Sequence, residues 1–463
     1  MVYQQKPVSR AVFRAYDIRG IVGQELDEHS FYSLGLAIAY HLQALQRRQI
    51  FLARDGRLTS ASLALALKQG LLESGIDVFD LGAVATPVMY YATHTQEIDC
   101  GLMVTASHNP ANYNGIKMVL AGKTLVQEDI DILYHLLIAK KRCFGQGQEM
   151  TADILPLYQQ CIIHDICLQR PLKIVVDCGN GIAGPVIPRV LAKLGCEVIP
   201  LYCDVDGHFP NHHPDPSIAA NLMDLKAAVA AHQADLGLAF DGDADRLGLV
   251  TNTGEMIWPD RLMILYVREV LSRIPGATVV FDVKCSSHLS SEIKALGGVA
   301  KMCPTGHSIV KGVMKKEQAV LAGEMSGHLF FKDRWYGFDD ALYSACRLLE
   351  IISASKLSVN EQFQLIPNSV NTAELKIKIA EKEKFLFMQR FNELAQFPTT
   401  AQIIAIDGLR VEFEHGWGLL RASNTTPCLV ARFEAVDQLH LEEIQQLFRV
   451  QIHRLDQELV LPF

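Results

Sequence analysis

The sequence predicts an α/β protein with three similar domains of mixed, mostly parallel sheet and a C-terminal α+β domain, around a central cleft. Three observations favour this fold class. The chain has 463 residues, which is too long for one ordinary core. Hydrophobic residues make up 49% and charged residues 20%, as in an ordered globular protein. An order of strand, helix, strand, helix and strand recurs three times, and each third strand leads into a polar loop.

The repeat places the expected strands. The first strands of the three units are expected at residues 49–56, 173–177 and 278–282. The third strands are expected at residues 100–104, 235–240 and 319–323. Parallel sheets bind ligands beyond the carboxyl ends of their strands. Each unit therefore presents one polar loop, and the three loops differ in chemistry.

The segment after about residue 366 has a different pattern. Residues 374–379 alternate as an exposed strand, a helix is expected over 381–394, and a final amphipathic helix over 439–455. Between the helices, further strands are expected at 407–413 and 417–421. We place the domain boundaries at 1–153, 154–255, 256–367 and 368–463.

Composition excludes several classes of partner. The net charge of −8 gives no general attraction to nucleic acid or to an anionic membrane. The N-terminus has no apolar signal region, and no run of about 18 apolar residues occurs. The eleven cysteines are scattered, without any C-x-x-C pair. We expect reduced thiols in a cytoplasmic protein that binds neither nucleic acid nor membrane.

The stretch T-A-S-H-N-P at 105–110 follows the third strand of the first unit. It offers the hydroxyl of Ser107 beside the imidazole of His108, and Lys117 lies ten residues further on. A solvated turn explains these six residues as well as a reactive serine does. No G-x-S-x-G pattern surrounds Ser107, which argues against a hydrolase nucleophile.

The stretch D-G-D-A-D-R at 241–246 follows the third strand of the second unit. An extended backbone would point Asp241, Asp243 and Asp245 to one side. Three converging carboxylates repel one another unless a hard cation lies between them, and oxygen ligands favour Mg²⁺. A solvated acidic turn is the alternative. Arg246 would balance charge and reach a phosphate.

Four other loops carry polar groups. G-E-M-S-G-H at 323–328 offers carboxylate, hydroxyl and imidazole, which suit vicinal sugar hydroxyls. R-A-S-N-T-T-P at 421–427 is rich in donors for phosphate oxygens. F-R-A-Y-D-I-R-G at 13–20 and C-P-T-G-H-S at 303–308 contain candidate contacts that ordinary loops also explain.

A glycine-rich loop supports a different hypothesis. G-N-G-I-A-G at 179–184 follows a strand and precedes a helix, and Asp204 lies near the end of the next strand. This pattern is compatible with an NAD or nucleotide-binding protein. Tight packing of a strand against a helix explains the same glycines.

Together the loops resemble those of the α-D-phosphohexomutase family, closest to the bacterial bifunctional phosphomannomutase/phosphoglucomutase group. T-A-S-H-N-P, D-G-D-A-D-R, G-E-M-S-G-H and R-A-S-N-T-T-P resemble its phosphoserine, metal, sugar and phosphate loops, in that order. The last loop lacks the S-G-T-E-P typical of phosphoglucosamine mutases. One departure is Ala244, where the family usually has Gly, so a positive φ there would be strained.

The resemblance implies a reversible phosphoryl transfer between O1 and O6 of mannose and glucose phosphates through a phosphoserine and a 1,6-bisphosphosugar. It implies one Mg²⁺ held by Ser107, Asp241, Asp243 and Asp245, and catalysis by Ser107, His108, Lys117, Arg246 and His328. The implied substrate contacts are Tyr16, Arg19, Lys284, His307, Glu324, Ser326, His328, Arg421, Ser423, Asn424 and Thr425.

The resemblance also implies a monomer and a place in carbohydrate metabolism, for example in nucleotide-sugar biosynthesis. Two other reactions stay open: a phosphoglucosamine mutase of the same family and a Mg²⁺-dependent phosphatase that uses Ser107. The sequence does not rank mannose phosphate over glucose phosphate, because no loop reads the sugar O2 clearly.

Overall fold

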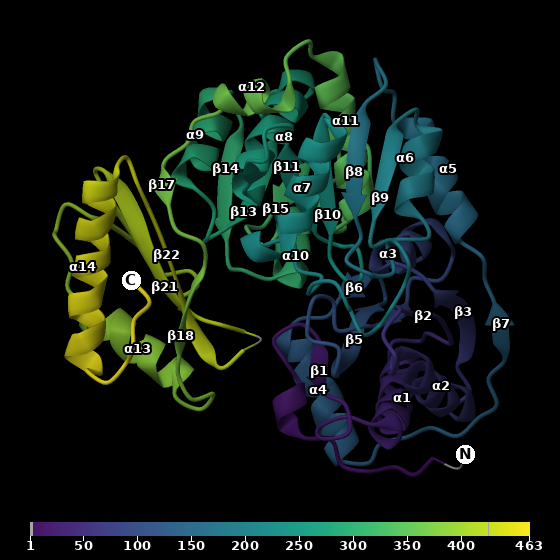
Figure 1. The fold of residues 1–463 in the computed structure, drawn as a ribbon. Coiled ribbons are helices and arrows are strands. Elements are labelled where there is room, and N and C mark those ends of the chain that lie inside the picture. Colours follow the sequence, from purple (N-terminus) through teal and green to yellow (C-terminus); the bar gives the residue numbers. More distant parts are fainter. Residues whose placement is uncertain (1–2, 425) are drawn as a thin grey trace.

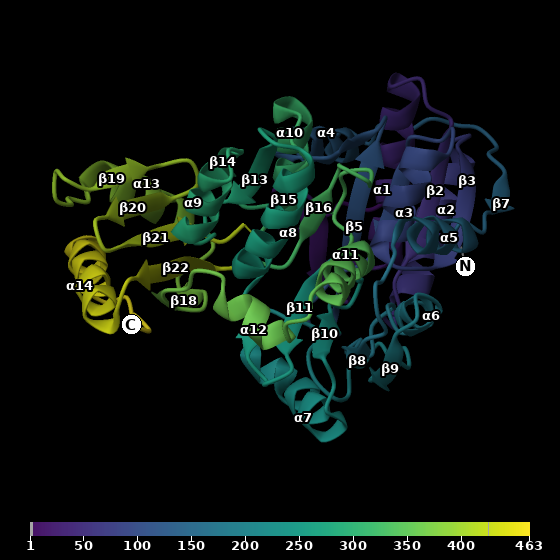
Figure 2. The ribbon, with the colours of Figure 1, turned by 90° about the horizontal axis from the view of Figure 1, so that it is seen from above.

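Four β-sheets organise the chain, one in each of four successive segments (Figure 1). The structure is a computed structural model that describes residues 3–424 and 426–463. The first three sheets mix parallel and antiparallel pairs, and the fourth is antiparallel. The fold class predicted from the sequence is confirmed. Seen from above, the third segment lies between the first and the fourth (Figure 2).

The first segment contains a sheet in the order β1-β5-β4-β2-β3-β7, with β6 beside β5. Its elements are η1 (Arg10–Val12), β1 (Ile18–Ile21), α1 (Glu28–Ala44), β2 (Gln49–Arg54), α2 (Ser60–Glu73), β3 (Asp77–Ala83), α3 (Thr86–Thr95), β4 (Gly101–Val104), β5 (Tyr113–Leu120), β6 (Lys123–Thr124), α4 (Gln127–Ile138) and β7 (Glu149–Thr151).

The second segment contains a sheet in the order β12-β11-β10-β8-β9. Its elements are α5 (Leu155–Asp165), β8 (Lys173–Asp177), α6 (Ile187–Lys193), β9 (Glu197–Leu201), η2 (Ala219–Leu222), α7 (Met223–His232), β10 (Leu236–Phe240), β11 (Leu247–Thr251) and β12 (Met256–Ile257).

The third segment contains a sheet in the order β14-β13-β15-β16. Its elements are α8 (Pro259–Arg273), β13 (Thr278–Asp282), α9 (Ser287–Ala295), β14 (Val299–Cys303), α10 (His307–Glu317), β15 (Leu321–Gly323), β16 (Leu329–Phe331), α11 (Ala341–Ala354) and α12 (Val359–Gln364).

The fourth segment contains the antiparallel order β17-β22-β21-β20-β19, with β18 beside β22. Its elements are β17 (Val370–Asn371), β18 (Leu375–Lys378), α13 (Lys384–Leu394), β19 (Gln402–Ile404), β20 (Leu409–Phe413), β21 (Gly416–Ala422), β22 (Cys428–Ala435) and α14 (Gln438–Leu455).

The internal repeat is present in the strand order. The triplets β4-β2-β3, β10-β8-β9 and β15-β13-β14 are each parallel, and the central strand of each comes first in sequence. An antiparallel strand, β5, β11 or β16, then follows beside the third strand. Strands such as β10 are buried along their whole length, as expected for a strand covered on both faces. The three polar loops therefore begin at equivalent strand ends.

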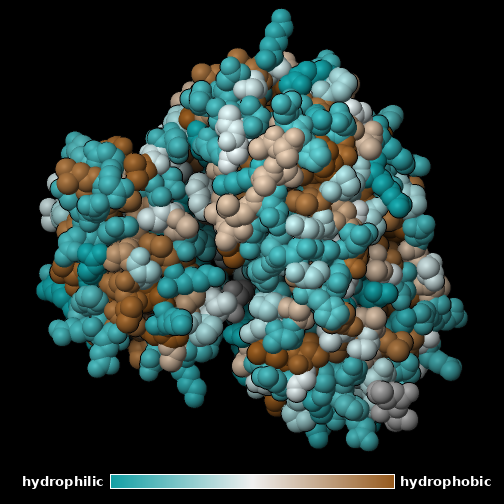
Figure 3. Space-filling model, in the orientation of Figure 1, coloured by the Kyte–Doolittle hydropathy of each residue, from teal (hydrophilic) through white to brown (hydrophobic). Residues whose placement is uncertain are grey.

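The fourth segment is fixed to the third by a buried cation. Arg410 donates to the backbone carbonyls of Val283 and Cys285, both at 2.7 Å, and its guanidinium lies 3.8 Å from the centre of the Trp417 ring. Across the hollow between the fourth and first segments, Arg14 pairs with Glu381 at 3.5 Å. This hollow is visible at the centre of the molecular surface (Figure 3). Among the described residues, no helix is both long and apolar enough to span a membrane.

Candidate active site

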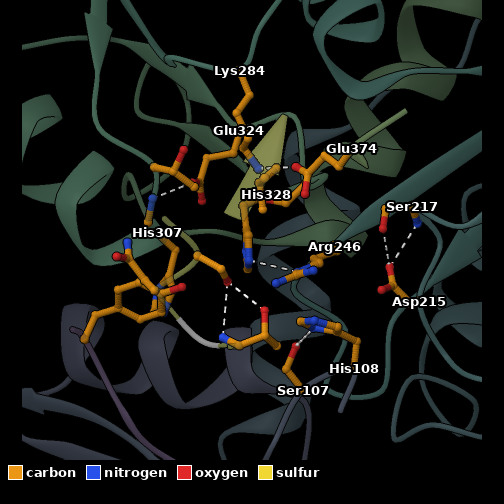
Figure 4. Close-up of a pocket in the computed structure, with 18 of the residues that line it drawn as sticks. Ser107, His108, Asp215, Ser217, Arg246, Lys284, His307, Glu324, His328 and Glu374 are labelled. Atoms are coloured by element: carbon orange, nitrogen blue, oxygen red, sulfur yellow. Dashed lines mark hydrogen bonds and ion pairs between the residues drawn. The ribbon is translucent and has the colours of Figure 1, made fainter. Parts of the chain in front are cut away.

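One cavity gathers most of the predicted site residues from all four segments (Figure 4). The predicted residues that line it are Tyr16, Arg19, Ser107, His108, Lys117, Arg246, Lys284, His307, Glu324, Ser326, His328, Arg421, Ser423 and Asn424. The three aspartates of the 241–246 loop lie immediately behind it, and Thr425 lies outside the described residues. The cavity therefore combines one serine, a carboxylate cluster and many cationic groups.

Ser107 lies directly after β4 with a φ of 51°, in the left-handed region that non-glycine residues rarely adopt. Its hydroxyl donates to Asp241 Oδ2 at 2.7 Å and lies 3.1 Å from His108 Nδ1. Burial and the neighbouring Arg246 guanidinium hold the pKa of His108 well below its usual range. The serine thus faces a neutral imidazole on one side and the carboxylate loop on the other.

The Ser107 loop is held from behind by Arg57, which the sequence analysis did not select. Arg57 Nη2 donates to the carbonyls of Ser107 at 2.6 Å and Asn109 at 2.7 Å. Asp55, at the end of β2, accepts a hydrogen bond of 2.7 Å from the Thr105 hydroxyl. These buried contacts support the strained backbone of the serine.

The 241–246 loop is a turn and not a continuation of β10, so the expected extended backbone was wrong. The strand ends at Phe240, the amide of Ala244 bonds to the Asp241 carbonyl at 3.1 Å, and Ala244 has a φ of 63°. The carboxylates nevertheless converge, because an oxygen from each of Asp241, Asp243 and Asp245 lies within 4.8 Å of the others. The turn, and not strand alternation, brings them together.

Lys117 of β5 is the cation nearest to these carboxylates in the structure. Its Nζ donates to Asp243 Oδ2 at 2.6 Å and also to Asp245 Oδ2. Burial lowers the pKa of Lys117, but Asp243 and Asp245 outweigh burial and raise it. Burial, together with Asp245 and Asp243, raises the pKa of Asp241 well above its usual range. Arg246 Nε lies 3.9 Å from Asp241 Oδ2, so one lysine and one more distant arginine face three carboxylates, which leaves them undercompensated.

The aspartate cluster fits a divalent cation. Oδ1 of Asp243 and Oδ1 of Asp245 are buried and lack any hydrogen-bond partner within the described residues. Hard oxygen ligands of this kind suit Mg²⁺. A buried carboxylate oxygen without a partner raises the free energy of the folded protein. A bound cation would give both oxygens a partner.

His328 connects the carboxylate loop to the third segment. Arg246 Nε donates to His328 Nε2 at 2.9 Å, while His328 Nδ1 lies 3.1 Å from Asp339 Oδ2. The ring of His307 stacks on His328 with centroids 5.4 Å apart. Burial, and then the Lys311 charge, hold the pKa of His307 well below its usual range.

The carboxylate of the 323–328 loop is held in place by a backbone amide. Glu324, directly after β15, accepts from the Gly306 amide at 2.7 Å, and burial raises its pKa. Lys284 Nζ contacts Glu374 at 2.5 Å from the fourth segment. Burial opposes the charged form of Lys284, but Glu374 outweighs it and raises the pKa. These groups form the wall of the cavity opposite Ser107.

The last loop contributes the basic end of the cavity. Arg421 of β21 is buried, its Nε donates to Asp407 at 2.9 Å, and its Nη2 has no hydrogen-bond partner in the part of the chain that the structure describes. Ser423 lies 2.8 Å from the Thr426 hydroxyl. On the opposite side, Arg19 donates to Asn109 at 2.6 Å. Cations thus lie at both ends of the cavity.

The glycine loop at 179–184 is explained by packing. A Cβ on Gly184 would lie 1.8 Å from the Cys203 carbonyl, and one on Gly181 would lie 2.9 Å from the Gly242 carbonyl. Gly179 has a φ of 49°. Gly181 therefore permits close approach to the carboxylate loop and Gly184 close approach to the segment after β9, which leaves the nucleotide hypothesis without support from this pattern.

Several functional contacts were not selected from the sequence. Asp339 precedes the apolar helix α11 beside Asp340, so the pair has the appearance of a helix cap. Glu374 begins the sequence stretch that alternates as an exposed strand, so the pattern indicates an exposed residue, and in the structure it directly precedes β18. The further cavity residues missed are Asp215, Ser217, Thr305, Lys376 and Thr426.

Comparison with known protein families identifies the class of protein. The four family models of phosphoglucomutase/phosphomannomutase match in order: α/β/α domain I at residues 10–141, domain II at 157–254, domain III at 258–369 and the C-terminal domain at 374–450. The chain therefore belongs to the phosphoglucomutase/phosphomannomutase family. It is an isomerase, and the family resemblance inferred from the four loops is confirmed.

Similar proteins carry the names phosphomannomutase and phosphoglucomutase. The chain is 49% identical to the phosphomannomutase/phosphoglucomutase of Pseudomonas aeruginosa over 453 residues, which are 98% of each chain. It is 49% identical to a phosphoglucomutase of Neisseria meningitidis serogroup A, covering 96% of this chain and 97% of that one. A crystal structure of a family protein from Burkholderia thailandensis superposes with a TM-score of 0.94 at 44% identity, covering 98% and 100% of the two chains.

Proposed function

We propose that this chain moves a phosphoryl group reversibly between O1 and O6 of mannose and glucose phosphates, through a phosphoserine and a bound 1,6-bisphosphosugar. The observation that carries the proposal is the contact of Ser107 Oγ with Asp241 Oδ2 at 2.7 Å, inside a cavity with cations at both ends. Two phosphates on one sugar need two basic regions, and the geometry supports such an arrangement.

Ser107 is the phosphate carrier in this proposal. It gives its phosphoryl group to one hydroxyl of the hexose phosphate and takes the other phosphate back after the bisphosphosugar has turned over. Asp241, Asp243 and Asp245, with a phosphoserine oxygen, would hold one Mg²⁺, whose charge stabilises the anionic transition state of phosphoryl transfer. Arg246 and His108 support the phosphoserine.

The attacking sugar hydroxyl must lose a proton, and the site offers two groups to take it. Lys117 lies against the carboxylate loop, and His328 lies beside Arg246 in the cavity. Proton transfer by a positioned group is worth roughly 10²–10⁴-fold in rate. We assign His328 and Lys117 to this task.

The remaining residues bind the sugar and its non-reacting phosphate. Glu324 and Ser326 are placed to hold vicinal hydroxyls O3 and O4, since a carboxylate and a hydroxyl offer the mixed acceptors and donors that diols need. The phosphate contacts proposed are Arg421, Ser423, Asn424 and Thr425, and the further substrate contacts are Tyr16, Arg19, Lys284 and His307.

We further propose the domain division 1–153, 154–255, 256–367 and 368–463, with one functional loop in each domain. The four separate sheets support this division, although β12 carries the second sheet to Ile257. A cytoplasmic monomer, a 1,6-bisphosphosugar activator and a role in nucleotide-sugar supply complete the proposal. The eleven cysteines are free, in keeping with reduced thiols.

The substrate assignment can be tested by ³¹P NMR. Purified protein with Mg²⁺ and catalytic glucose 1,6-bisphosphate is given mannose 1-phosphate, glucose 1-phosphate or glucosamine 1-phosphate in turn. We expect the mannose and glucose compounds to become 6-phosphates without release of inorganic phosphate. Conversion of glucosamine 1-phosphate alone would favour the phosphoglucosamine mutase, and accumulating inorganic phosphate would favour the phosphatase. Ser107→Ala is the control, because it removes the carrier and keeps the cavity.

A further inference from the structure

His328 is held between a donor and an acceptor, and this fixes which of its nitrogens carries the proton. Arg246 Nε is always a donor and lies 2.9 Å from His328 Nε2. Nε2 must therefore be the unprotonated acceptor in a neutral ring. The proton of the ring then lies on Nδ1, on the side away from Arg246.

The group that faces Nδ1 is the carboxylate of Asp339, 3.1 Å away through Oδ2. Asp339 is fully buried, and its other oxygen, Oδ1, accepts from Lys311 Nζ at 2.8 Å. Oδ1 of Asp339 thus meets Lys311, while Oδ2 and His328 Nδ1 face each other at 3.1 Å and neither has another hydrogen-bond partner within the described residues. Lys311 is itself confined, because its Nζ lies 3.9 Å from the centre of the Tyr90 ring.

Two other contacts of this His328–Asp339 pair are longer. Asp245 Oδ1 lies 3.6 Å from His328 Nδ1, and His307 Nδ1 lies 3.6 Å from Asp339 Oδ2. The atoms of Asp245, His328 and Asp339 are close enough to suggest a second metal site. A metal at this place would need a lone pair on Nδ1. Because Arg246 donates to Nε2, the single proton of the neutral ring is on Nδ1. We therefore favour a proton, and not a metal, between His328 Nδ1 and the Asp339 carboxylate.

We propose that Asp339 is a positioning residue that sets the tautomer and orientation of His328, so that Nε2 keeps the lone pair used as base toward the sugar hydroxyl. This inference rests on the proposed mutase function. Arg246 covers that lone pair in the structure, and a phosphate that draws its guanidinium away leaves Nε2 free. The arrangement follows the general logic of a carboxylate that orients a histidine base.

The substitution Asp339→Asn tests the proposal sharply because Lys311 limits how the new amide can lie. Lys311 only donates, so the amide oxygen must face it, and the amide NH₂ must then face His328 Nδ1. Nδ1 becomes an acceptor and the proton moves to Nε2, where it opposes Arg246. The variant should therefore hold the wrong tautomer.

The readouts are the tautomer and the rate. Long-range ¹H–¹⁵N spectra of histidine-labelled protein, assigned with His328→Gln, should show the Nδ1–H tautomer in the wild type and the Nε2–H tautomer in Asp339→Asn. We expect kcat to fall ~10²-fold or more, with KM for glucose 1-phosphate changed less than about threefold. Asp340→Asn is the matched control, since Asp340 is a buried neighbour that bonds to Tyr158 and not to His328.

The double variant Lys311→Met/Asp339→Asn separates tautomer control from a merely structural role. Without the lysine, the amide can turn its oxygen to Nδ1, so the Nδ1–H tautomer and about tenfold or more of kcat should return. An Nε2–H tautomer in the wild type, or a slow Asp339→Asn enzyme with the tautomer unchanged, would overturn the proposal. So would a restored tautomer without a restored rate.

If Asp339→Asn does not fold, Asp339→Glu and the wild-type spectrum decide. A wild type without mutase activity would refute the proposed function but leave the tautomer measurement valid.

Discussion

Replacing Lys117 by methionine should make the folded protein depend on Mg²⁺. Lys117 Nζ lies 2.6 Å from Asp243 Oδ2 and also bonds to Asp245, and all three residues are buried. Methionine keeps most of the volume of the side chain but removes its charge. Among the described residues, Arg246, whose Nε lies 3.9 Å from Asp241 Oδ2, would then be left to balance three carboxylates unless a metal binds.

The size of the effect follows from this burial. Breaking a buried ion pair by removing one partner costs about 3–5 kcal/mol, because an uncompensated charge stays inside the protein. Mg²⁺ at a free concentration of about one hundred times its Kd would return ~2.7 kcal/mol by binding only the folded state. The metal should therefore restore half or more of the lost stability.

Thermal or urea unfolding in EDTA and in saturating Mg²⁺ measures both the lost unfolding free energy and the part that Mg²⁺ returns. We expect Lys117→Met to unfold far below the wild type in EDTA, and saturating Mg²⁺ to return half or more of that lost stability, judged against the wild type in EDTA. Lys68→Met is the matched control, because Lys68 also meets two carboxylates, Asp80 at 2.9 Å and Glu149 at 2.5 Å, near the surface. That variant should lose about 1 kcal/mol or less, without Mg²⁺ dependence. A Lys117→Met protein as stable as the wild type in EDTA would refute the reasoning.

Three further variants test other parts of the site. Ala244→Gly should change the unfolding free energy by about 1 kcal/mol or less. Glycine relieves the left-handed strain, which is worth ~1–2 kcal/mol. It also costs about 0.5–1 kcal/mol of backbone entropy and about 0.8 kcal/mol for the lost buried methyl group, so the contributions nearly cancel. A loss of stability above about 2 kcal/mol in a melting experiment would contradict this balance. Arg57→Met should slow phosphorylation of Ser107 by glucose 1,6-bisphosphate, measured by intact mass, since the carbonyls of the loop lose their donor; an unchanged rate would show that Arg57 does not position the loop. Lys284→Met should raise KM more than it lowers kcat in a coupled mutase assay, because Lys284 lies in the wall opposite Ser107; the reverse split would place Lys284 in the chemistry.

The sequence allowed the repeat and its loops to be predicted because both are local patterns. Apolar strands such as β10, followed at once by polar residues, indicate strand ends without knowledge of the partner strands. The three equivalent triplets of strands then follow from the common order of elements. The positions of Ser107, Asp241 and Glu324 at those strand ends needed no tertiary information.

Contacts between segments could not be predicted in the same way. The bond from Lys117 to Asp243 joins residues 126 positions apart, and no local pattern indicates it. The turn at Ala244 is contrary to the usual preference of alanine, so tertiary structure decided its backbone. The contact of Asp339 with His328 could not be predicted either, because an acidic residue before an apolar helix is typical of a helix N-cap.

The most direct test of the central claim is the location of the phosphate during turnover. Protein incubated with glucose 1,6-bisphosphate is digested and the peptide that contains Ser107 is sequenced by mass spectrometry, before and after addition of mannose 1-phosphate. We expect one phosphoryl group on Ser107 that is discharged to the sugar and not to water, and no phosphoryl group in Ser107→Ala. Full mutase activity without phosphate on Ser107 would contradict the account.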